Sequence, residues 1–227
     1  MSTIYIGRTK MANLLLEAET EEALETRRIH FGSRPIGFER FLDLAQNRFV
    51  ELVDGVIVEN PMVQLDHELC SRWLYQVMGL YAQRLDLGEM LSSRIMVKTE
   101  NFGGRMPDLL FVRKENLQIV QQRAVYGAPD LIIEIVSPND RPSDLRSLEA
   151  DYYRLGVPEL MFIQLSKKEV RTLRRTEEGY TELIIREGLV SFASMPELKL
   201  EASWILEHPR PDPFIFLTEH FKLNPAE

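Results

Sequence analysis

Two acidic side chains lie beside strongly apolar runs of the sequence. Asp108 opens the run Asp-Leu-Leu-Phe-Val, and Glu134 lies in the middle of the run Leu-Ile-Ile-Glu-Ile-Val. A buried carboxylate that is ionised and unpaired is very costly, so Glu134 needs a cation, a basic partner or a raised pKa. If the two runs form neighbouring strands, their carboxylates converge and could share a divalent metal ion.

This acid pair predicts a Mg²⁺ site, with Mn²⁺ as a substitute. Hard cations such as Mg²⁺ bind carboxylate oxygens, backbone carbonyls and water, and Ile135 could supply the carbonyl. A metal at this point would polarise a phosphodiester and lower the pKa of an attacking water. The alternative interpretation is structural: Glu134 pairs with an Arg or Lys inside the sheet, while Asp108 only caps a strand end.

Other common catalytic patterns are missing from the sequence. The pair Gly103-Gly104 is not followed by the Gly-Lys-Ser/Thr of a phosphate-binding loop. No serine lies in a nucleophile elbow. Cys70 is the single cysteine, which excludes an intramolecular disulfide and a cysteine-based zinc site.

The elements expected to position the acids alternate between helices and strands. They are a helix at 38–46, a hairpin that turns at Asp54-Gly55, a helix at 66–86, strands at 90–98, 108–112 and 130–136, a helix at 144–155, a strand at 159–165 and a β meander. The runs at 108–112 and 130–136 are nearly continuous, as is typical of strands buried on both faces. This order predicts an α/β fold with a mixed sheet covered by helices.

Composition limits the class of protein. The 227-residue chain is 44% hydrophobic and 27% charged, which is ordinary for a globular protein. Its formal net charge of −8 restricts any nucleic-acid surface to a local patch or a bound cation. No apolar run is long enough to span a bilayer and no secretory signal is evident, so we expect a cytoplasmic protein. The regions expected are an N-terminal extension at 1–34, the main domain at 35–207 and a C-terminal surface tail at 208–227.

Several motifs, taken in order, resemble the Uma-two family of the PD-(D/E)XK nuclease superfamily. They are VELVDG, a histidine in the following helix, PDLLFV, PDLIIEIVSPND, YYRLGV and PELMFIQL. The resemblance runs from Phe38 to Leu206 and implies a restriction-endonuclease-like mixed β-sheet flanked by helices, here with an added β meander. It also implies a Mg²⁺ site on Asp108 and Glu134, phosphodiester hydrolysis of DNA, and a homodimer.

The same resemblance implies a lysine that this chain lacks. In the family pattern the lysine lies four residues before a helix tyrosine, and counted from Tyr152 that position is Leu148. Lys98 and Arg146 are candidates to replace its charge, although an arginine is a poor general base because its pKa stays above about 12. His67 matches a histidine common in the family and is a further catalytic candidate.

Three further groups of residues have weaker signals. Basic residues alternate along the hairpin that follows residue 165 and form the best local candidate for a phosphate-binding surface: Lys167, Lys168, Arg171, Arg174 and Arg175. Glu51, beside the hairpin turn, is a candidate to face the site. Tyr152 and Tyr153 are expected to pack the helix against the sheet.

We therefore expect a Mg²⁺-dependent endonuclease whose active site is degraded by the loss of the usual lysine. The alternative is a catalytically inactive nuclease-fold protein that serves as a binding or assembly module. The missing lysine and the acidic net charge favour the inactive protein, whereas retention of both acids favours the nuclease. A glycosidase would also use an acid pair, but no other pattern supports one.

Overall fold

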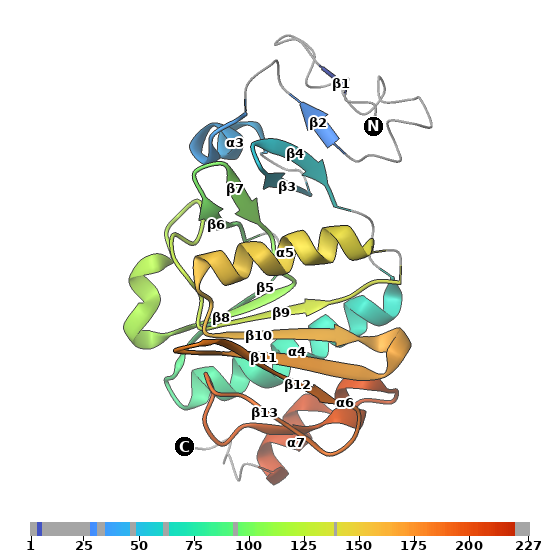
Figure 1. The fold of residues 1–227 in the computed structure, drawn as a ribbon. Helices are drawn as coiled ribbons and strands as arrows, with labels where there is room; N and C mark the ends of the chain where they lie inside the picture. The colour runs from blue at the N-terminus through green and yellow to red at the C-terminus, as the bar shows by residue number, and fades with distance from the viewer. Residues whose placement is uncertain are drawn as a thin grey trace.

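The fold was analysed in a computed structural model of the chain (Figure 1). It describes residues 4–5, 28–30, 35–45, 49–60, 64–92, 95–138 and 140–220. Most of the expected N-terminal extension, 1–34, lies outside these residues. Within the described residues, no helix is long and apolar enough to cross a membrane.

A mixed sheet forms the centre of the molecule. Among the described residues its strand order is β12-β11-β10-β9-β8-β5. The strands are β5 (Gly88–Ser92), β8 (Leu109–Arg113), β9 (Leu131–Ile135), β10 (Glu159–Gln164), β11 (Glu169–Thr176) and β12 (Gly179–Ile185). Strands β9 and β10 are parallel, and the other neighbouring pairs are antiparallel. The predicted mixed sheet is therefore confirmed.

The two long helices cover opposite faces of this sheet (Figure 1). Helix α4 (Leu65–Arg84) packs on the face that carries Phe111 and Ile133. Helix α5 (Pro142–Leu155) packs on the face that carries Leu110 and Ile132. Because successive side chains of a strand point to opposite faces, a continuous apolar run is what a strand between two helices requires.

A second, smaller sheet lies beyond helix α5 (Figure 1). Its order is β1-β2-β4-β3-β7-β6. The strands are β1 (Ile4–Tyr5), β2 (Arg28–His30), β3 (Val50–Val53), β4 (Val56–Glu59), β6 (Val97–Glu100) and β7 (Gly103–Arg105), with α3 (Phe38–Leu44) packed nearby. The predicted hairpin turn is confirmed, because Asp54 and Gly55 have φ of 51° and 76°, as two-residue turns of this kind need.

The prediction of a single strand at 90–98 is wrong. Its first part, β5, joins the central sheet, whereas β6 joins the smaller sheet. The strand β7 was not predicted, since its residues Gly103–Arg105 include two glycines, which rarely mark a strand. The main chain therefore leaves one sheet and enters the other just before Asp108.

Helix ends follow local signals only in part. Helix α5 ends as predicted, with Gly156 in the left-handed region at φ 80°. Helix α4, in contrast, begins at Leu65, one residue before the predicted start at residue 66. Two short 3₁₀ helices, η2 (Lys114–Ile119) and η3 (Leu165–Lys167), follow β8 and β10.

The C-terminal region contributes to the core instead of lying only on the surface. The strands β13 (Leu189–Ser191) and β14 (Lys199–Glu201) pair with each other, and α6 (Ala202–Leu206) and α7 (Pro213–His220) follow. Phe216 of α7 is 2% exposed and packs against Trp73 of α4, with ring centroids 6.4 Å apart. The expectation of a surface tail is therefore wrong for α7.

Candidate functional site

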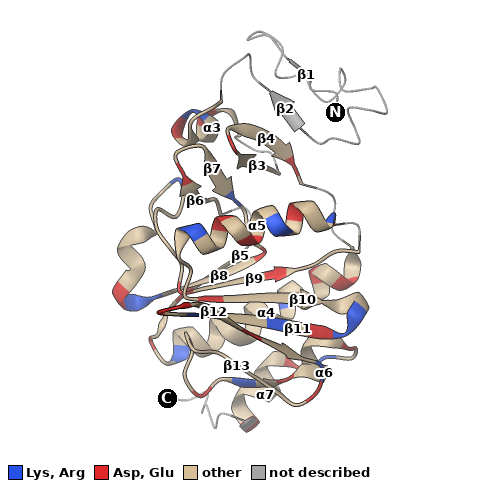
Figure 2. Cartoon of the chain, viewed as in Figure 1, with Lys and Arg blue, Asp and Glu red and all other residues tan. Residues whose placement is uncertain are grey.

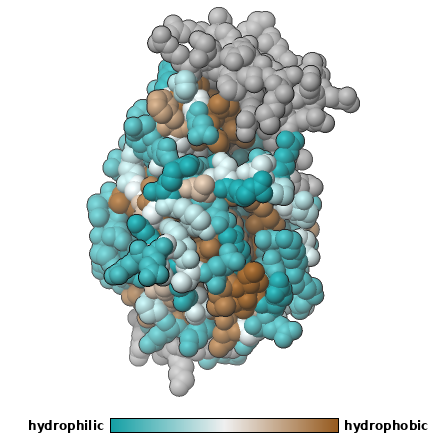
Figure 3. All heavy atoms as spheres, viewed as in Figure 1, coloured by the Kyte–Doolittle hydropathy of each residue, from teal (hydrophilic) through white to brown (hydrophobic). Residues whose placement is uncertain are grey.

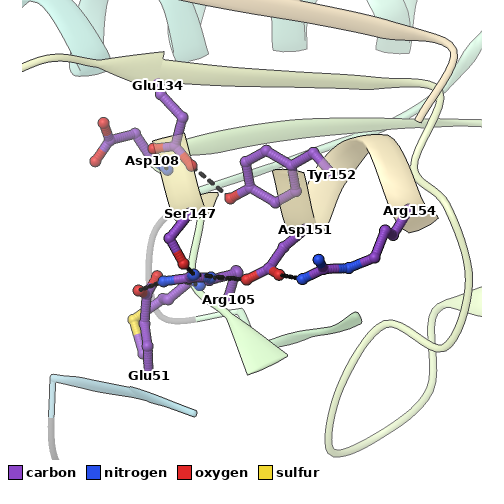
Figure 4. A network of polar contacts seen from close by, with 9 residues as sticks. Glu51, Arg105, Asp108, Glu134, Ser147, Asp151, Tyr152 and Arg154 are labelled. Atoms are coloured by element: carbon purple, nitrogen blue, oxygen red, sulfur yellow. Dashed lines mark hydrogen bonds and ion pairs between the residues drawn. The ribbon is translucent and has the colours of Figure 1, made fainter. Parts of the chain in front are cut away.

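Strands β8 and β9 bring Asp108 and Glu134 together. Leu109 pairs with Ile133, so the next position of the antiparallel ladder places Asp108 across from Glu134. The Asp108 backbone amide lies 3.4 Å from Glu134 Oε2, and the Ile135 amide donates to Asp108 Oδ2 at 2.8 Å. Figure 4 shows the two carboxylates side by side at the end of the strand pair. The convergence predicted from the two apolar runs is thus present.

Glu134 has no basic partner among the residues that the structure describes. Its carboxylate accepts hydrogen bonds from the Tyr152 hydroxyl and the Asp108 backbone amide. Burial raises the pKa of Glu134 well above its ordinary value of 4.5, and the neighbouring negative charge of Asp108 raises it further. The structural alternative, in which an Arg or Lys neutralises Glu134 inside the sheet, is therefore not observed.

His67 approaches the same site from the first turn of α4. Its Nε2 lies 3.0 Å from Asp108 Oδ2. Burial lowers the pKa of His67, but the hydrogen bond and the charge of Asp108 outweigh burial, so the pKa is raised from 6.5. The other ring nitrogen, Nδ1, is buried without a hydrogen-bond partner. The structure therefore places this candidate beside the acid pair.

A buried arginine, which the sequence reasoning missed, connects the surroundings of both acids. Arg105 is 4% exposed. Its guanidinium contacts Glu51 Oε2 at 3.1 Å, Asp151 Oδ2 at 2.6 Å and Ser147 Oγ at 2.9 Å (Figure 4). Glu51 also accepts the backbone N–H of Met106 at 2.8 Å, two residues before Asp108.

This network determines the role of Glu51. Burial raises the pKa of Glu51 from 4.5, although Arg105 and the Met106 amide oppose the rise. Arg105 in turn is shared by two carboxylates, so its charge is already compensated. Glu51 and Arg105 therefore support the segment before Asp108, and Asp151 supports the helix that carries Tyr152.

Neither predicted replacement for the lysine contacts the acid pair. Lys98 Nζ lies 3.9 Å from Glu39 Oε1 and 5.4 and 5.5 Å from the ring centroids of Phe38 and Tyr126. Its contacts are therefore around the smaller sheet. Arg146 is exposed on α5, and no hydrogen bond or ion pair joins it to Asp108 or Glu134.

Leu148, at the position of the missing lysine, faces the central sheet, whereas Arg146 faces solvent. It is partly buried in the cluster that contains Tyr152 and Phe162, between α5 and the sheet. Residues two positions apart in a helix point about 200° apart, so Arg146 cannot face the sheet where Leu148 does. Tyr152, one turn further along the same face of α5, bonds Glu134, so position 148 faces the sheet one turn from that contact.

The donor atoms at this site fit a hard divalent cation. Asp108 and Glu134 provide two carboxylates, and the Ile135 carbonyl lies on the same strand edge as the Ile135 amide that reaches Asp108. In the described part of the chain no three His, Cys, Asp or Glu side chains form a metal-binding cluster. This small donor set suits Mg²⁺, which keeps several waters and commonly binds one or two protein carboxylates.

Most of the basic residues on the hairpin are bonded to other groups of the chain and are not free to contact a phosphate backbone. Arg171 is paired with Glu149 and Glu182, and Arg174 with Glu159. Lys168 contacts Glu207, while Arg175 donates to the Gly156 carbonyl. Figure 2 shows the acidic residues interspersed with the basic ones along this region. The expected phosphate-binding surface is therefore largely compensated by acids.

A mixed sheet between helices, with two acids on adjacent strands, is the restriction-endonuclease-like architecture. The chain belongs to the Uma2 family, described as "Putative restriction endonuclease", whose model matches residues 38–205. Among solved structures the chain is similar to "a putative nuclease belonging to DUF820" from Anabaena variabilis ATCC 29413. That similarity has a TM-score of 0.65 and 18% identity, and covers 76% of this chain and 98% of the other. No match was found among curated proteins. The family resemblance inferred from the motifs is confirmed, and it supports a nuclease function.

Proposed function

We propose that this protein is a Mg²⁺-dependent endonuclease that hydrolyses phosphodiester bonds in DNA. The observation that carries the proposal is the convergence of Asp108 and Glu134 without a compensating basic side chain. Two carboxylates so close in a partly buried site repel each other, and a bound cation would remove that repulsion. Family membership supports the same chemistry.

The residues of the chain divide the work of such a site. Asp108, Glu134 and the Ile135 carbonyl would hold Mg²⁺, or Mn²⁺ in its place. When bound, the metal would polarise the phosphodiester and lower the pKa of an attacking water. His67 orients the Asp108 carboxylate, and the Tyr152 hydroxyl orients the Glu134 carboxylate.

The loss of the lysine limits the expected activity. Leu148 cannot orient a water or stabilise charge on a phosphate, and the contacts of Lys98 lead away from the acids. We therefore expect slow hydrolysis at best. The second candidate function is that of an inactive nuclease-fold protein that acts as a binding or assembly module. The leucine at position 148, in place of the lysine, favours it.

DNA is the proposed substrate and a homodimer the proposed assembly, both from the family resemblance. The net charge of −8 means that contact with phosphates would depend strongly on the bound cation and on low salt. DNA affinity should therefore rise when Mg²⁺ is added, and this rise should depend on Asp108.

A plasmid-nicking assay tests the enzymatic proposal. Wild-type protein with Mg²⁺ or Mn²⁺ should convert supercoiled plasmid to the nicked form, and Asp108→Ala should abolish the conversion. Glu89→Ala, an exposed acid on β5, is the matched control and should retain full activity. Equal nicking by wild type and Asp108→Ala would show that the activity comes from a contaminant and would reject the enzyme.

Calorimetry separates the enzyme from the inactive alternative. Mn²⁺ should bind wild-type protein and Glu89→Ala with similar heats, and Glu134→Ala should lose that heat. Metal binding without nicking would favour the inactive module. Equal heats for wild type and Glu134→Ala would contradict the proposed metal site itself.

A further inference from the structure

Asp108 lies in a short connection between the two sheets. Strand β7 of the smaller sheet ends at Arg105, and strand β8 of the central sheet begins at Leu109. Glu134, in contrast, lies inside β9, which pairs with β8 on one side and with β10 on the other. The strand ladder therefore fixes the main chain of Glu134, whereas the main chain of Asp108 needs other contacts to hold it.

The connection Met106-Pro107-Asp108 has two N–H groups, because proline has none. A glutamate lies at each of them. The Met106 N–H donates to Glu51 Oε1 at 2.8 Å. The Asp108 N–H points to Glu134 Oε2 at 3.4 Å. The connection is therefore held between an acid of the smaller sheet and an acid of the central sheet.

The register of the smaller sheet places Glu51 for this contact. Strand β3 pairs with β7 through Leu52 and Gly104, so the next position of the antiparallel ladder brings Glu51 beside Arg105. Glu51 is 8% exposed, and its second carboxylate oxygen, Oε2, binds Arg105 at 3.1 Å. Both oxygens therefore have partners inside the chain, which suits a group that holds its neighbours and not one that binds a metal ion itself.

Arg105 extends the network to the helix that holds Glu134 (Figure 4). It contacts Asp151 Oδ2 at 2.6 Å, and the next residue of α5, Tyr152, donates to the Glu134 carboxylate. Figure 3 shows mainly hydrophilic residues on the outer side of α5, whereas Asp151 is 6% exposed. Buried polar networks are worth more than the sum of their single bonds. The contacts close a ring, whose members in order are Asp108, Met106, Glu51, Arg105, Asp151, Tyr152 and Glu134.

Asp108 is the acid of the pair that is easier to displace. Its carboxylate is held by the Ile135 amide and by His67, but its main chain lies outside the strand ladder. Two neighbouring carboxylates repel each other, and in the metal-free protein this repulsion acts to move Asp108 away from Glu134. Glu51 opposes the movement through the N–H group two residues before Asp108.

We propose that Glu51 is a positioning residue of the metal site, which fixes the separation of the Asp108 and Glu134 carboxylates. This inference rests on the proposed function, because it concerns the affinity of the proposed Mg²⁺ site. Glu51 does not touch the metal ion; it acts through the main chain of Asp108. Groups behind metal ligands typically contribute a factor of about 10–100 in metal affinity, and we expect Glu51 to contribute a factor of this size.

Calorimetric titration with Mn²⁺ tests the proposal. A negative charge at position 51 would attract a cation even without a positioning role, so the variants must separate charge from reach. Glu51→Asp keeps the charge but is one methylene too short to reach both partners, and should weaken binding by about 10–100-fold. Glu51→Gln loses the charge but keeps an oxygen for the Met106 N–H, and should weaken binding less. The reverse order would show an effect of charge alone and would overturn the proposal.

Two further variants complete the test. Glu59→Gln removes a partly exposed acid from the neighbouring strand β4, across from Val50, and should bind Mn²⁺ like wild type. Ser147→Ala removes one hydroxyl that binds Arg105 at 2.9 Å, and it keeps the test valid if the variants at position 51 do not fold. It should weaken binding by a smaller factor than Glu51→Asp, with an unchanged circular dichroism spectrum.

The outcomes separate this proposal from the proposed function. A wild-type protein that gives no heat with Mn²⁺ would reject the metal site itself. A wild-type protein that binds Mn²⁺, with the same affinity as folded Glu51→Asp and Ser147→Ala, would reject the positioning role alone.

Discussion

The Tyr152 hydroxyl donates a hydrogen bond to the Glu134 carboxylate, and so joins helix α5 to the central strand β9. Burial raises the pKa of Tyr152 well above its ordinary value of 10.0, and Glu134 raises it further, so the hydroxyl remains a donor. The bond lowers the pKa of Glu134, but burial and the charge of Asp108 outweigh it and keep that pKa raised.

The raised pKa of Glu134 predicts how stability depends on pH. Because the folded-state pKa exceeds the unfolded value of 4.5, the folded chain binds more protons. The stabilisation of the fold that comes from this extra proton binding is fully present below the unfolded pKa. It is lost as the pH rises through the folded pKa. Glu134→Gln imitates the protonated acid. In metal-free urea denaturation, its advantage in unfolding free energy over wild type should therefore grow as the pH rises from the unfolded pKa of 4.5 through the raised folded pKa.

Two controls accompany this pH experiment. Saturating Mg²⁺ should narrow the difference in unfolding free energy between Glu134→Gln and wild type, because a metal binds only the ionised carboxylate. Glu149→Gln should behave oppositely: burial raises the pKa of Glu149, but the hydrogen bonds from Arg171 and Tyr153 and the charge of Arg171 together outweigh burial and lower it. Its loss of stability should be largest at neutral pH and vanish in acid. A difference between wild type and Glu134→Gln that does not change with pH would contradict the raised pKa.

Restoring a lysine at position 148 should increase hydrolysis. Leu148 lies in the cluster of Tyr152 between α5 and the sheet, so the ammonium of Leu148→Lys would extend toward the acid pair. Single electrostatic groups in active sites contribute about 10²–10³ in rate, and an adaptable new side chain should recover at least about tenfold. The plasmid-nicking rate measures the gain, and Leu148→Met is the size-matched control. Equal rates for the two variants would exclude this position from the site.

Removing the charge of Arg105 should destabilise the fold. Arg105→Met leaves Glu51 buried without its cation and leaves Asp151 with only the half-exposed Arg154, and breaking a buried pair costs about 3–5 kcal/mol. Arg105→Lys should recover part of the loss, since an ammonium lacks the planar fork that reaches three partners. Chemical denaturation measures both. The exposed pair between Arg123 and Asp43 is the control, and Arg123→Met should cost at most about 1 kcal/mol.

The packing of α7 makes a separate prediction about the C-terminal region. Phe216 is 2% exposed, whereas Phe214 in the same helix is 59% exposed. Phe216→Ala should lower the free energy of unfolding by about 3–5 kcal/mol, because a buried phenyl ring is replaced by a cavity. Phe214→Ala should change it by less than about 0.5 kcal/mol. Equal effects in urea denaturation would show that α7 does not pack on α4 in solution.

Local patterns in the sequence were sufficient for the strands that carry the acids. The continuous apolar runs predict β8 and β9 as buried strands, and an acid inside such a run is unusual wherever the run lies. The hairpin at Asp54-Gly55 and the end of α5 at Gly156 also follow from local backbone preferences. These features depend on residues a few positions apart, so the sequence alone is enough to predict them.

Only the tertiary structure could assign partners over long sequence separations. Arg105 lies 54 residues from Glu51 and 46 from Asp151, and nothing near Arg105 in the sequence marks it as buried. The orientation of Lys98 away from the acids and the burial of Phe216 depend on packing in the same way. By itself the sequence determined which acids need compensation, because desolvation follows from the apolar residues around them. The fold decided which groups provide it, because that depends on which distant segments meet.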